Sequence, residues 1–92
     1  MAFFILMTTI PTIHLNGTAG EDLKQEYYAA YKAIDAAIDA LQTATFNGRD
    51  FYPQGSHAYS QARTERDATF EKLCQAHSYV EDMLSGICDQ LP

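Results

Sequence analysis

Positive charge is scarce in this sequence. Six Lys and Arg residues stand against twelve Asp and Glu, which gives a formal charge of −6 and a pI near 4.7. Phosphate backbones and anionic membrane surfaces repel such a chain, so the balance argues against nonspecific nucleic-acid binding and leaves only a local basic site open. The length of 92 residues holds one domain, which excludes enzymes with separate cofactor and substrate domains.

The motifs that usually mark an active site are missing as well. The sequence has no glycine-rich phosphate loop, nucleophile elbow or CxxC pair, and no Glu-x-x-His pair of the kind found in di-metal bundles. Cys74, His77 and Glu81 have helical ligand spacing, but no second pair completes a metal site. We interpret them as a half-buried cysteine beside an exposed histidine. We therefore expect no enzymatic activity, cofactor or metal.

Long apolar runs are absent too. Residues 1–7 are apolar, but a membrane span takes roughly 20 such residues. A signal peptide needs a basic start and a small-residue cleavage site, and neither precedes Pro11. We expect no membrane association. Two interpretations of the segment stay open: Met7 is the natural start, or residues 1–7 form an apolar arm that packs against a partner subunit.

The two cysteines, Cys74 and Cys88, fall in one predicted helix. A rise of about 1.5 Å per residue separates them by about 21 Å, which is outside the reach of a disulfide. Two free thiols are typical of a reducing compartment, so we expect a cytoplasmic protein.

A segment without Asp, Glu, Lys or Arg opens the chain. Residues 8–15 are rich in β-branched side chains and include Pro11, which predicts an extended arm with one edge strand at most. Asn16 and Gly17 then predict a turn. We assign residues 1–17 to an N-terminal arm and residues 18–92 to a helical domain.

The first helix is predicted over residues 18–46. Thr18 and Glu21 match a capping box at its start, and Asn47-Gly48 is a typical helix end. Between them one face is apolar at steps of three and four residues. That face contains Leu23, Tyr27, Ala30, Tyr31, Ile34, Ala37, Ile38 and Leu41. We expect Tyr28 to lie beside this face, exposed and available to a partner.

The second helix is predicted over residues 56–89, with Ser56 as its cap. Pro53 and Gly55 exclude a helix directly before it. Its apolar face is expected to contain Tyr59, Ala62, Arg66, Thr69, Phe70, Leu73, Ala76, Val80, Met83, Leu84 and Ile87.

These segments predict an all-α fold, an antiparallel two-helix hairpin with an extended N-terminal arm. Small domains bury only about 60% of their unfolded surface, and both apolar faces are wider than one seam between two helices requires. We therefore expect copies of the chain to complete a four-helix bundle, as a homodimer or a higher oligomer.

The predicted loop between the helices concentrates binding chemistry. Arg49, Asp50, Tyr52 and Gln54 lie within six residues of one another, and Arg and aromatic side chains dominate binding hot spots and stack on nucleotides. The alternative is structural: Phe51 and Tyr52 close the open end of the bundle while Arg49 and Asp50 pair.

His14 and Asn16 of the arm are further binding candidates, although helix capping also explains residues 16–18. The arm and the loop lie at opposite ends of a hairpin, about 35 to 40 Å apart. They can form one site only across an antiparallel subunit pair.

Residues 14–18 (His-Leu-Asn-Gly-Thr) and 47–55 (Asn-Gly-Arg-Asp-Phe-Tyr-Pro-Gln-Gly) carry a resemblance. They are similar to segments of small helical proteins encoded by bacteriophages and prophages, a group without an assigned activity. The resemblance covers most of the chain from Met7 onward. It implies a phage origin and a place in the host cytoplasm, and it transfers no catalytic or binding residue.

Three functional hypotheses follow. The first is a non-enzymatic phage accessory protein that inhibits a host factor, as anti-CRISPR and other anti-defence proteins do, by placing an acidic helical surface in a basic channel. The second is a sponge that sequesters a nucleotide immune signal through Arg49, Tyr52 and Asn16. The third is a structural protein of the virion or of DNA packaging.

Overall fold

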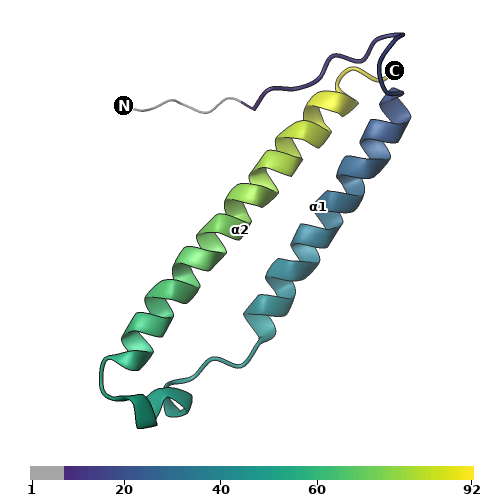
Figure 1. Ribbon diagram of the computed structural model, residues 1–92. Helices are drawn as coiled ribbons and strands as arrows, with labels where there is room; N and C mark the ends of the chain where they lie inside the picture. The colour runs from purple at the N-terminus through teal and green to yellow at the C-terminus, as the bar shows by residue number, and fades with distance from the viewer. Residues whose placement is uncertain (1–7) are drawn as a thin grey trace, which may run out of the picture.

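The computed structural model describes residues 8–92, which contain two long helices and a short one. These are α1 (Gly20–Thr43), the 3-10 helix η1 (Gly48–Gln54) and α2 (Ala58–Cys88). The two long helices run antiparallel, with η1 at the end of the hairpin opposite the arm (Figure 1). No residue from 8 to 92 lies in a strand. The predicted all-α hairpin is confirmed, whereas both interpretations of residues 1–7 fall outside the described residues.

The starts of both long helices differ from the predictions. The N-cap of α1 is Ala19, and no side chain caps the helix there. The capping box assigned to Thr18 and Glu21 was therefore wrong. At Gly20, the first residue of α1, the arm and the C-terminal segment pack directly on the helix: a Cβ there would lie 2.9 Å from Ile13 Cδ1 and closer still to Leu91.

Ser56 does not cap α2 either. The helix begins at Ala58, and its N-cap residue His57 makes no side-chain capping hydrogen bond. Ser56 lies instead in the turn that follows Gly55. The predicted end of this helix is close to the observed one at Cys88.

The end of α1 also comes earlier than predicted. The helix stops at Thr43, and Ala44 is extended with a ψ of 138°. Phe46 explains the difference, because its ring packs on the ring of Tyr59 in α2, and the chain must leave the axis of α1 to bring it there. Asn47-Gly48 is therefore not the end of α1, and Gly48 does not adopt the positive φ that is common after a helix; among the described residues, Gly55 has the positive φ, at 108°.

Pro53 and Gly55 do not exclude every helix from the connector, because residues 48–54 form η1. Asn47 caps it, its Oδ1 accepting a hydrogen bond from the Arg49 backbone N–H at 3.0 Å. Pro53 fits near the C-terminal end of η1 since its fixed φ is compatible with a 3-10 turn. The exclusion holds only for an α-helix, and Gly55 then redirects the chain into α2.

The N-terminal arm is extended, as predicted, and it is fastened to the C-terminal end of α2. Thr8 Oγ1 donates a hydrogen bond to Asp82 at 2.8 Å. The side chain of Gln90 holds the arm twice: its Oε1 accepts from the Ile13 N–H at 2.9 Å, and its Nε2 donates to the Pro11 carbonyl at 2.8 Å.

Among residues 8–92, buried apolar side chains are confined to this end of the hairpin, and Ile87 is the one that is fully buried. Val80, Met83 and Ile87 are the buried hydrophobic residues of the described chain, and all three lie in the last turns of α2. Here the arm adds a third element: Ile10 lies on Gly86, where a Cβ would come within 2.6 Å of Ile10 Cγ2. In the described part of the chain, apolar side chains are buried only where three segments meet.

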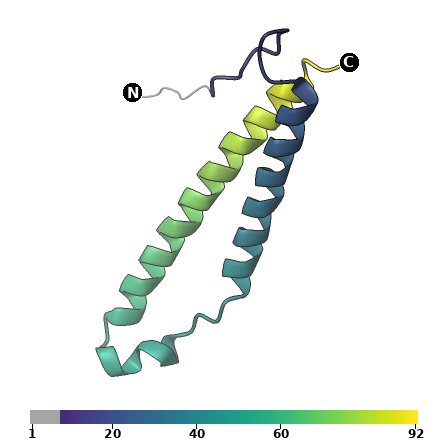
Figure 2. The same ribbon diagram turned by 45° about the vertical axis from the view of Figure 1, so that its right-hand side comes forward.

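Elsewhere the molecule is one layer of helices. Its extents are 61 × 33 × 17 Å, while a single helix with side chains is about 10–12 Å thick. The helices separate toward the connector (Figure 1 and Figure 2). The predicted apolar face of α1 is half-buried except for Ala37, which is exposed. Away from the arm, this single layer therefore leaves the apolar side chains between the helices only half-buried.

The apolar face of α2 is rotated slightly from the predicted one. Thr69 and Ala76 are exposed, and His77 takes a half-buried position on the face instead. This reverses our interpretation of the cysteine and histidine pair, because Cys74 is exposed while His77 is the half-buried residue.

Candidate functional site

Three aromatic rings hold the connector end together. The ring of Phe46 lies 5.3 Å from that of Tyr59 and 5.7 Å from that of Phe51, and the Phe51 and Tyr59 rings are 6.0 Å apart. Tilted pairs at these separations are favourable aromatic contacts. They fix η1 against the first turn of α2, so Phe51 does close this end of the hairpin.

Arg66 supports the same cluster from α2. Its guanidinium lies 4.9 Å from the centre of the Phe46 ring and 4.8 Å from that of Phe70. Nη2 also reaches the Leu41 carbonyl at 3.5 Å, near the C-terminal end of α1, whose last turn has no basic residue of its own. A cation is favourable at that negative end of the helix dipole. Arg66 is thus committed to packing.

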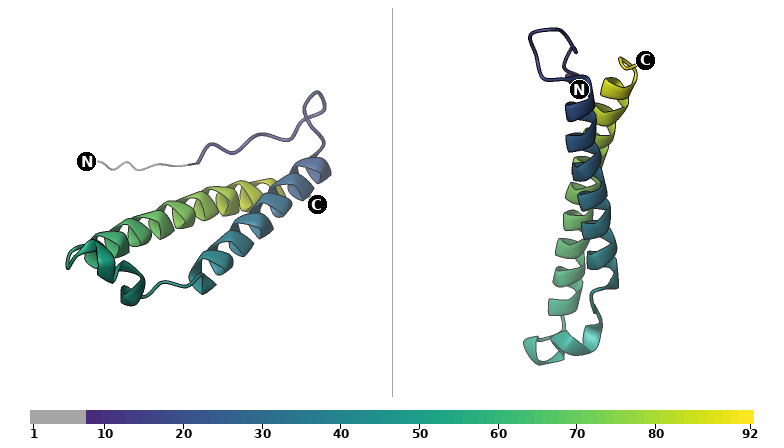
Figure 3. Two further views of the ribbon diagram at one scale, coloured as in Figure 1. Left: turned by 60° about the horizontal axis from the view of Figure 1, so that its bottom comes forward. Right: turned by 90° about the vertical axis from the view of Figure 1, so that its right-hand side faces the viewer.

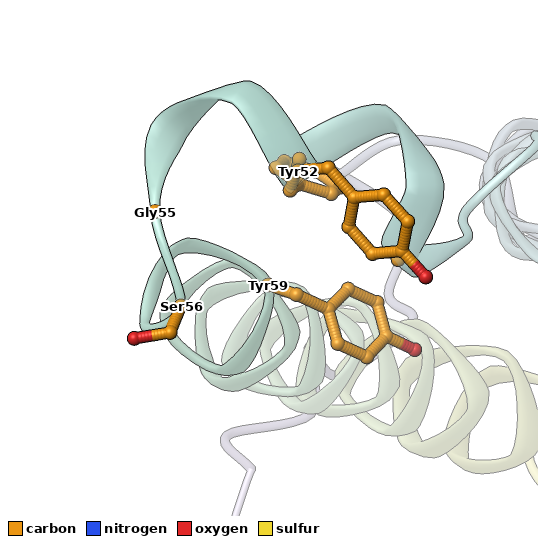
Figure 4. Close-up of a pocket in the computed structure, with 6 residues that line it drawn as sticks. Tyr52, Gly55, Ser56 and Tyr59 are labelled. Carbon is orange, nitrogen blue, oxygen red and sulfur yellow. The ribbon is translucent and has the colours of Figure 1, made fainter.

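A pocket opens beside this cluster, and we call it the tyrosine slot. Its lining residues are Gly48, Phe51, Tyr52, Gly55, Ser56 and Tyr59, and its volume is about 470 Å³. The rings of Tyr52 and Tyr59 lie side by side, with their hydroxyls at the same end (Figure 4). Gly48 brings the backbone close to both rings: a Cβ there would lie 3.7 Å from Tyr59 and 3.9 Å from Tyr52.

The chemistry of the slot is that of binding. The aromatic faces suit a flat or apolar group, and the tyrosine hydroxyls offer hydrogen bonds at the rim. Ser56 Oγ points away from the rings (Figure 4), and no histidine or carboxylate lines the pocket. The lining therefore lacks the paired nucleophile and base that covalent catalysis needs.

The structure brings four of the predicted site residues together. Arg49, Asp50, Tyr52 and Gln54 all lie on η1 and are exposed, Tyr52 by 73%. Within residues 8–92, Arg49 forms no ion pair with Asp50. The alternative interpretation of the loop, in which Phe51 closes the end and Arg49 pairs with Asp50, therefore holds for Phe51 and fails for the charged pair. Tyr52 stays largely in solvent instead of closing the end.

The other three predicted residues lie away from η1. His14 and Asn16 are exposed on the arm, at the opposite end of the hairpin, as the sequence predicted (Figure 1). Tyr28 is 52% exposed on α1, which confirms its expected exposure. One chain alone does not join the arm and connector motifs into a single site.

Sequence reasoning missed the partners that make the slot. Tyr59 was assigned to the apolar face of the second helix, and Phe46 was placed inside the first. The available signal was the clustering of Phe46, Phe51, Tyr52 and Tyr59 within fourteen positions. Leu15 was also overlooked, although it is 99% exposed.

His77 makes an unusual contact across the two long helices. Its Nε2 lies 3.2 Å from Asp35 Oδ1, which is within ion-pair distance, but this nitrogen makes no hydrogen bond. The His77 ring also packs on the Tyr31 ring at 4.7 Å. His77 therefore faces α1. In residues 8–92, no group of three or more His, Cys, Asp or Glu side chains is placed to hold a metal ion.

None of the helices in residues 8–92 combines the length and hydrophobicity that crossing a bilayer requires. Comparisons of the chain with models of protein families, with curated proteins and with solved structures gave no match.

Proposed function

We propose that this chain is a non-enzymatic phage accessory protein that inhibits a host defence factor by binding it, as an anti-CRISPR does. The supporting observation is the surface charge. All twelve acidic side chains are exposed, whereas one of the six basic ones, Arg66, is withdrawn between two phenyl rings. The exposed charges are therefore mostly carboxylates, in agreement with the formal charge of −6.

Such a surface suits a partner that normally binds nucleic acid. A channel lined by Lys and Arg attracts polyanions, and complementary charge accelerates encounter and selects partners. The long acidic hairpin would occupy that channel in the host cytoplasm and compete with the nucleic acid for it.

The protein acts in this proposal as a homo-oligomer, with helices of two copies forming a four-helix bundle. The supporting observation is that, within residues 8–92, apolar side chains are buried only where the arm supplies a third segment. A second copy supplies the missing layer over the rest of the hairpin. Light scattering after size exclusion should give a mass of at least twice 10.3 kDa; a single 10.3 kDa species would contradict the assembly.

Host-factor binding is tested with tagged protein in lysate of the host. We expect capture of a nucleic-acid-binding protein that is released as salt rises and is displaced by added duplex DNA or RNA. Replacing Asp67 and Glu71 by Asn and Gln should weaken capture, whereas replacing Ser60 and Ser78 by Ala, the uncharged control, should not. Capture that ignores both salt and nucleic acid would contradict the proposed mode.

The tyrosine slot favours a second candidate function, a sponge for a nucleotide signal. Two aromatic faces beside the exposed Arg49 suit a stacked base with a phosphate. Cyclic and ADP-ribose-type nucleotides at 100 times their dissociation constant would stabilise the fold by about 2.7 kcal/mol. The rise in melting temperature should vanish in Tyr52→Ala and persist in Tyr28→Ala. No shift with any such nucleotide would exclude the sponge.

A further inference from the structure

Leu15 is the most exposed large apolar side chain of the described chain, at 99%. It sits on a hydrogen-bonded turn, in which the Gly17 N–H donates to the His14 carbonyl at 3.1 Å. The loop that carries this turn projects beyond the ends of the two helices (Figure 3). A leucine held out on a fixed turn is typical of a contact residue, because burial against a partner removes its apolar surface from water.

The tyrosine slot at the other end of the hairpin is an apolar receptor with room for such a side chain. Its volume of about 470 Å³ exceeds that of a leucine side chain several-fold, so the neighbouring turn backbone can enter as well. Tyr52, 73% exposed, has apolar ring surface left to cover. The hydroxyls of Tyr52 and Tyr59 can meet the polar backbone of an incoming turn.

Turn and slot cannot meet within one chain, since they lie at opposite ends of a molecule 61 Å long. A two-fold axis perpendicular to the long axis of the hairpin brings the turn of each copy beside the connector of the other. The same contact then forms twice and the assembly closes on itself. A parallel pair would place turn against turn and slot against slot.

Charge favours the ends as the points of contact. Two chains that each carry −6 repel one another. Residues 8–20 contain no Asp, Glu, Lys or Arg, and the charges on η1 are one Arg49 and one Asp50. An uncharged turn therefore meets a connector with balanced charge, and the contact places no carboxylate against another.

We propose that Leu15 of one copy inserts into the tyrosine slot of a second copy, and reciprocally, in an antiparallel homodimer. This inference rests on the homo-oligomer proposed above and specifies its geometry. It also brings His14 and Asn16 of one copy next to Arg49 and Tyr52 of the other.

Disulfide trapping tests the contact directly. In a Cys74→Ser, Cys88→Ser background, a chain that carries both Leu15→Cys and Tyr52→Cys should oxidise to a covalent dimer with a 15–52 linkage by mass spectrometry. The pair Leu15→Cys with Tyr28→Cys is the control and should not cross-link. A 15–15 linkage from Leu15→Cys alone would establish a parallel pair and overturn the proposal.

The second test measures the dimer dissociation constant from the mass of the protein in solution. Leu15→Asp should raise the dimer dissociation constant about 100-fold, because two leucines per dimer return to water and each contributes about tenfold. Thr12→Asp, the same charge on an exposed residue of the same arm, should leave the dimer intact. Circular dichroism should show unchanged helix content in both variants, since Leu15 supports nothing within its own chain.

The outcomes separate this proposal from the assembly on which it rests. A monomeric unmodified chain overturns both. A dimer that resists Leu15→Asp and gives no 15–52 linkage overturns the insertion of Leu15 and leaves the homo-oligomer standing. If Thr12→Asp dissociates the dimer as strongly as Leu15→Asp, charge on the arm and not the leucine side chain is responsible, and the insertion is likewise overturned.

Discussion

Substitution of Gly86 by Ala tests how the arm packs on α2, because the added methyl group has two opposite effects on stability. In the interior of α2, Gly86→Ala should stabilise the helix by about 1 kcal/mol, the difference in intrinsic propensity. In the folded chain the added Cβ would lie 2.6 Å, 2.8 Å and 3.0 Å from three carbons of Ile10. Such distances require the arm to move.

The two effects have different sizes. Overpacking a fitted contact costs about 1–3 kcal/mol, so Gly86→Ala in the unmodified chain should be destabilising by up to about 2 kcal/mol after the propensity gain is deducted. In an Ile10→Ala background the obstruction is gone and only the propensity gain remains. The substitution should then stabilise by about 1 kcal/mol, and the two backgrounds should differ by about 2 kcal/mol.

Thermal unfolding followed by helical circular dichroism measures this cycle. A change of 1 kcal/mol shifts the melting temperature of a domain of this size by about 4–8 °C. All four chains must be compared at one protomer concentration, because the proposed assembly would make the melting temperature depend on concentration. If Gly86→Ala raises the melting temperature equally in both backgrounds, Ile10 does not pack on Gly86 and our description of the arm is wrong.

Three further substitutions test other contacts. His77→Leu should raise stability by about 1–2 kcal/mol by removing an unsatisfied buried nitrogen; a lower melting temperature would show that the contact with Asp35 is stabilising. Arg66→Ala should lower the free energy of unfolding by about 1–2 kcal/mol through the loss of two cation–π contacts. In the same assay, Arg63→Ala at an exposed position should change it by no more than about 0.5 kcal/mol. Asn47→Ala should cost about 1 kcal/mol by removing the η1 cap, visible as faster amide exchange in η1 before α1 or α2 opens.

The apolar periodicity predicted the helices well because it records which side of each helix meets its neighbour. It placed all but one residue of the α1 face, and it failed on α2 at Thr69 and Ala76. In a long helix with few strongly apolar residues, small and polar residues make the predicted apolar face differ from the observed one by one residue, as at Ala76 and His77. His77 was wrongly interpreted as exposed for a related reason, since its ring contributes apolar surface that a count of hydrophobic residues ignores.

Local signals failed wherever a distant segment decided the outcome. Thr18 and Ser56 are good capping residues by type, yet neither caps a helix. Ile13 packs on Gly20 at the start of α1. Gly55 turns the chain before α2 through its positive φ. The tyrosine slot could not be predicted, because it depends on the early exit of the chain from α1 toward Tyr59. The exposed residues on η1 needed no such contact, and the sequence placed them in the connector, where they lie.

The half-buried apolar face and the acidic surface suit two different kinds of partner. Carboxylates are exposed along both helices, while most side chains of the apolar faces are only half-buried outside the end that the arm covers. A second copy can cover the apolar face without meeting the outer carboxylates, and a basic host surface can bind the outer side of the assembled bundle. Dissolved salt does not weaken the burial of apolar surface, but it screens and weakens the attraction between exposed charges. The homo-oligomer should therefore persist at a salt concentration that releases the host factor, and a common salt dependence would mean that one surface serves both.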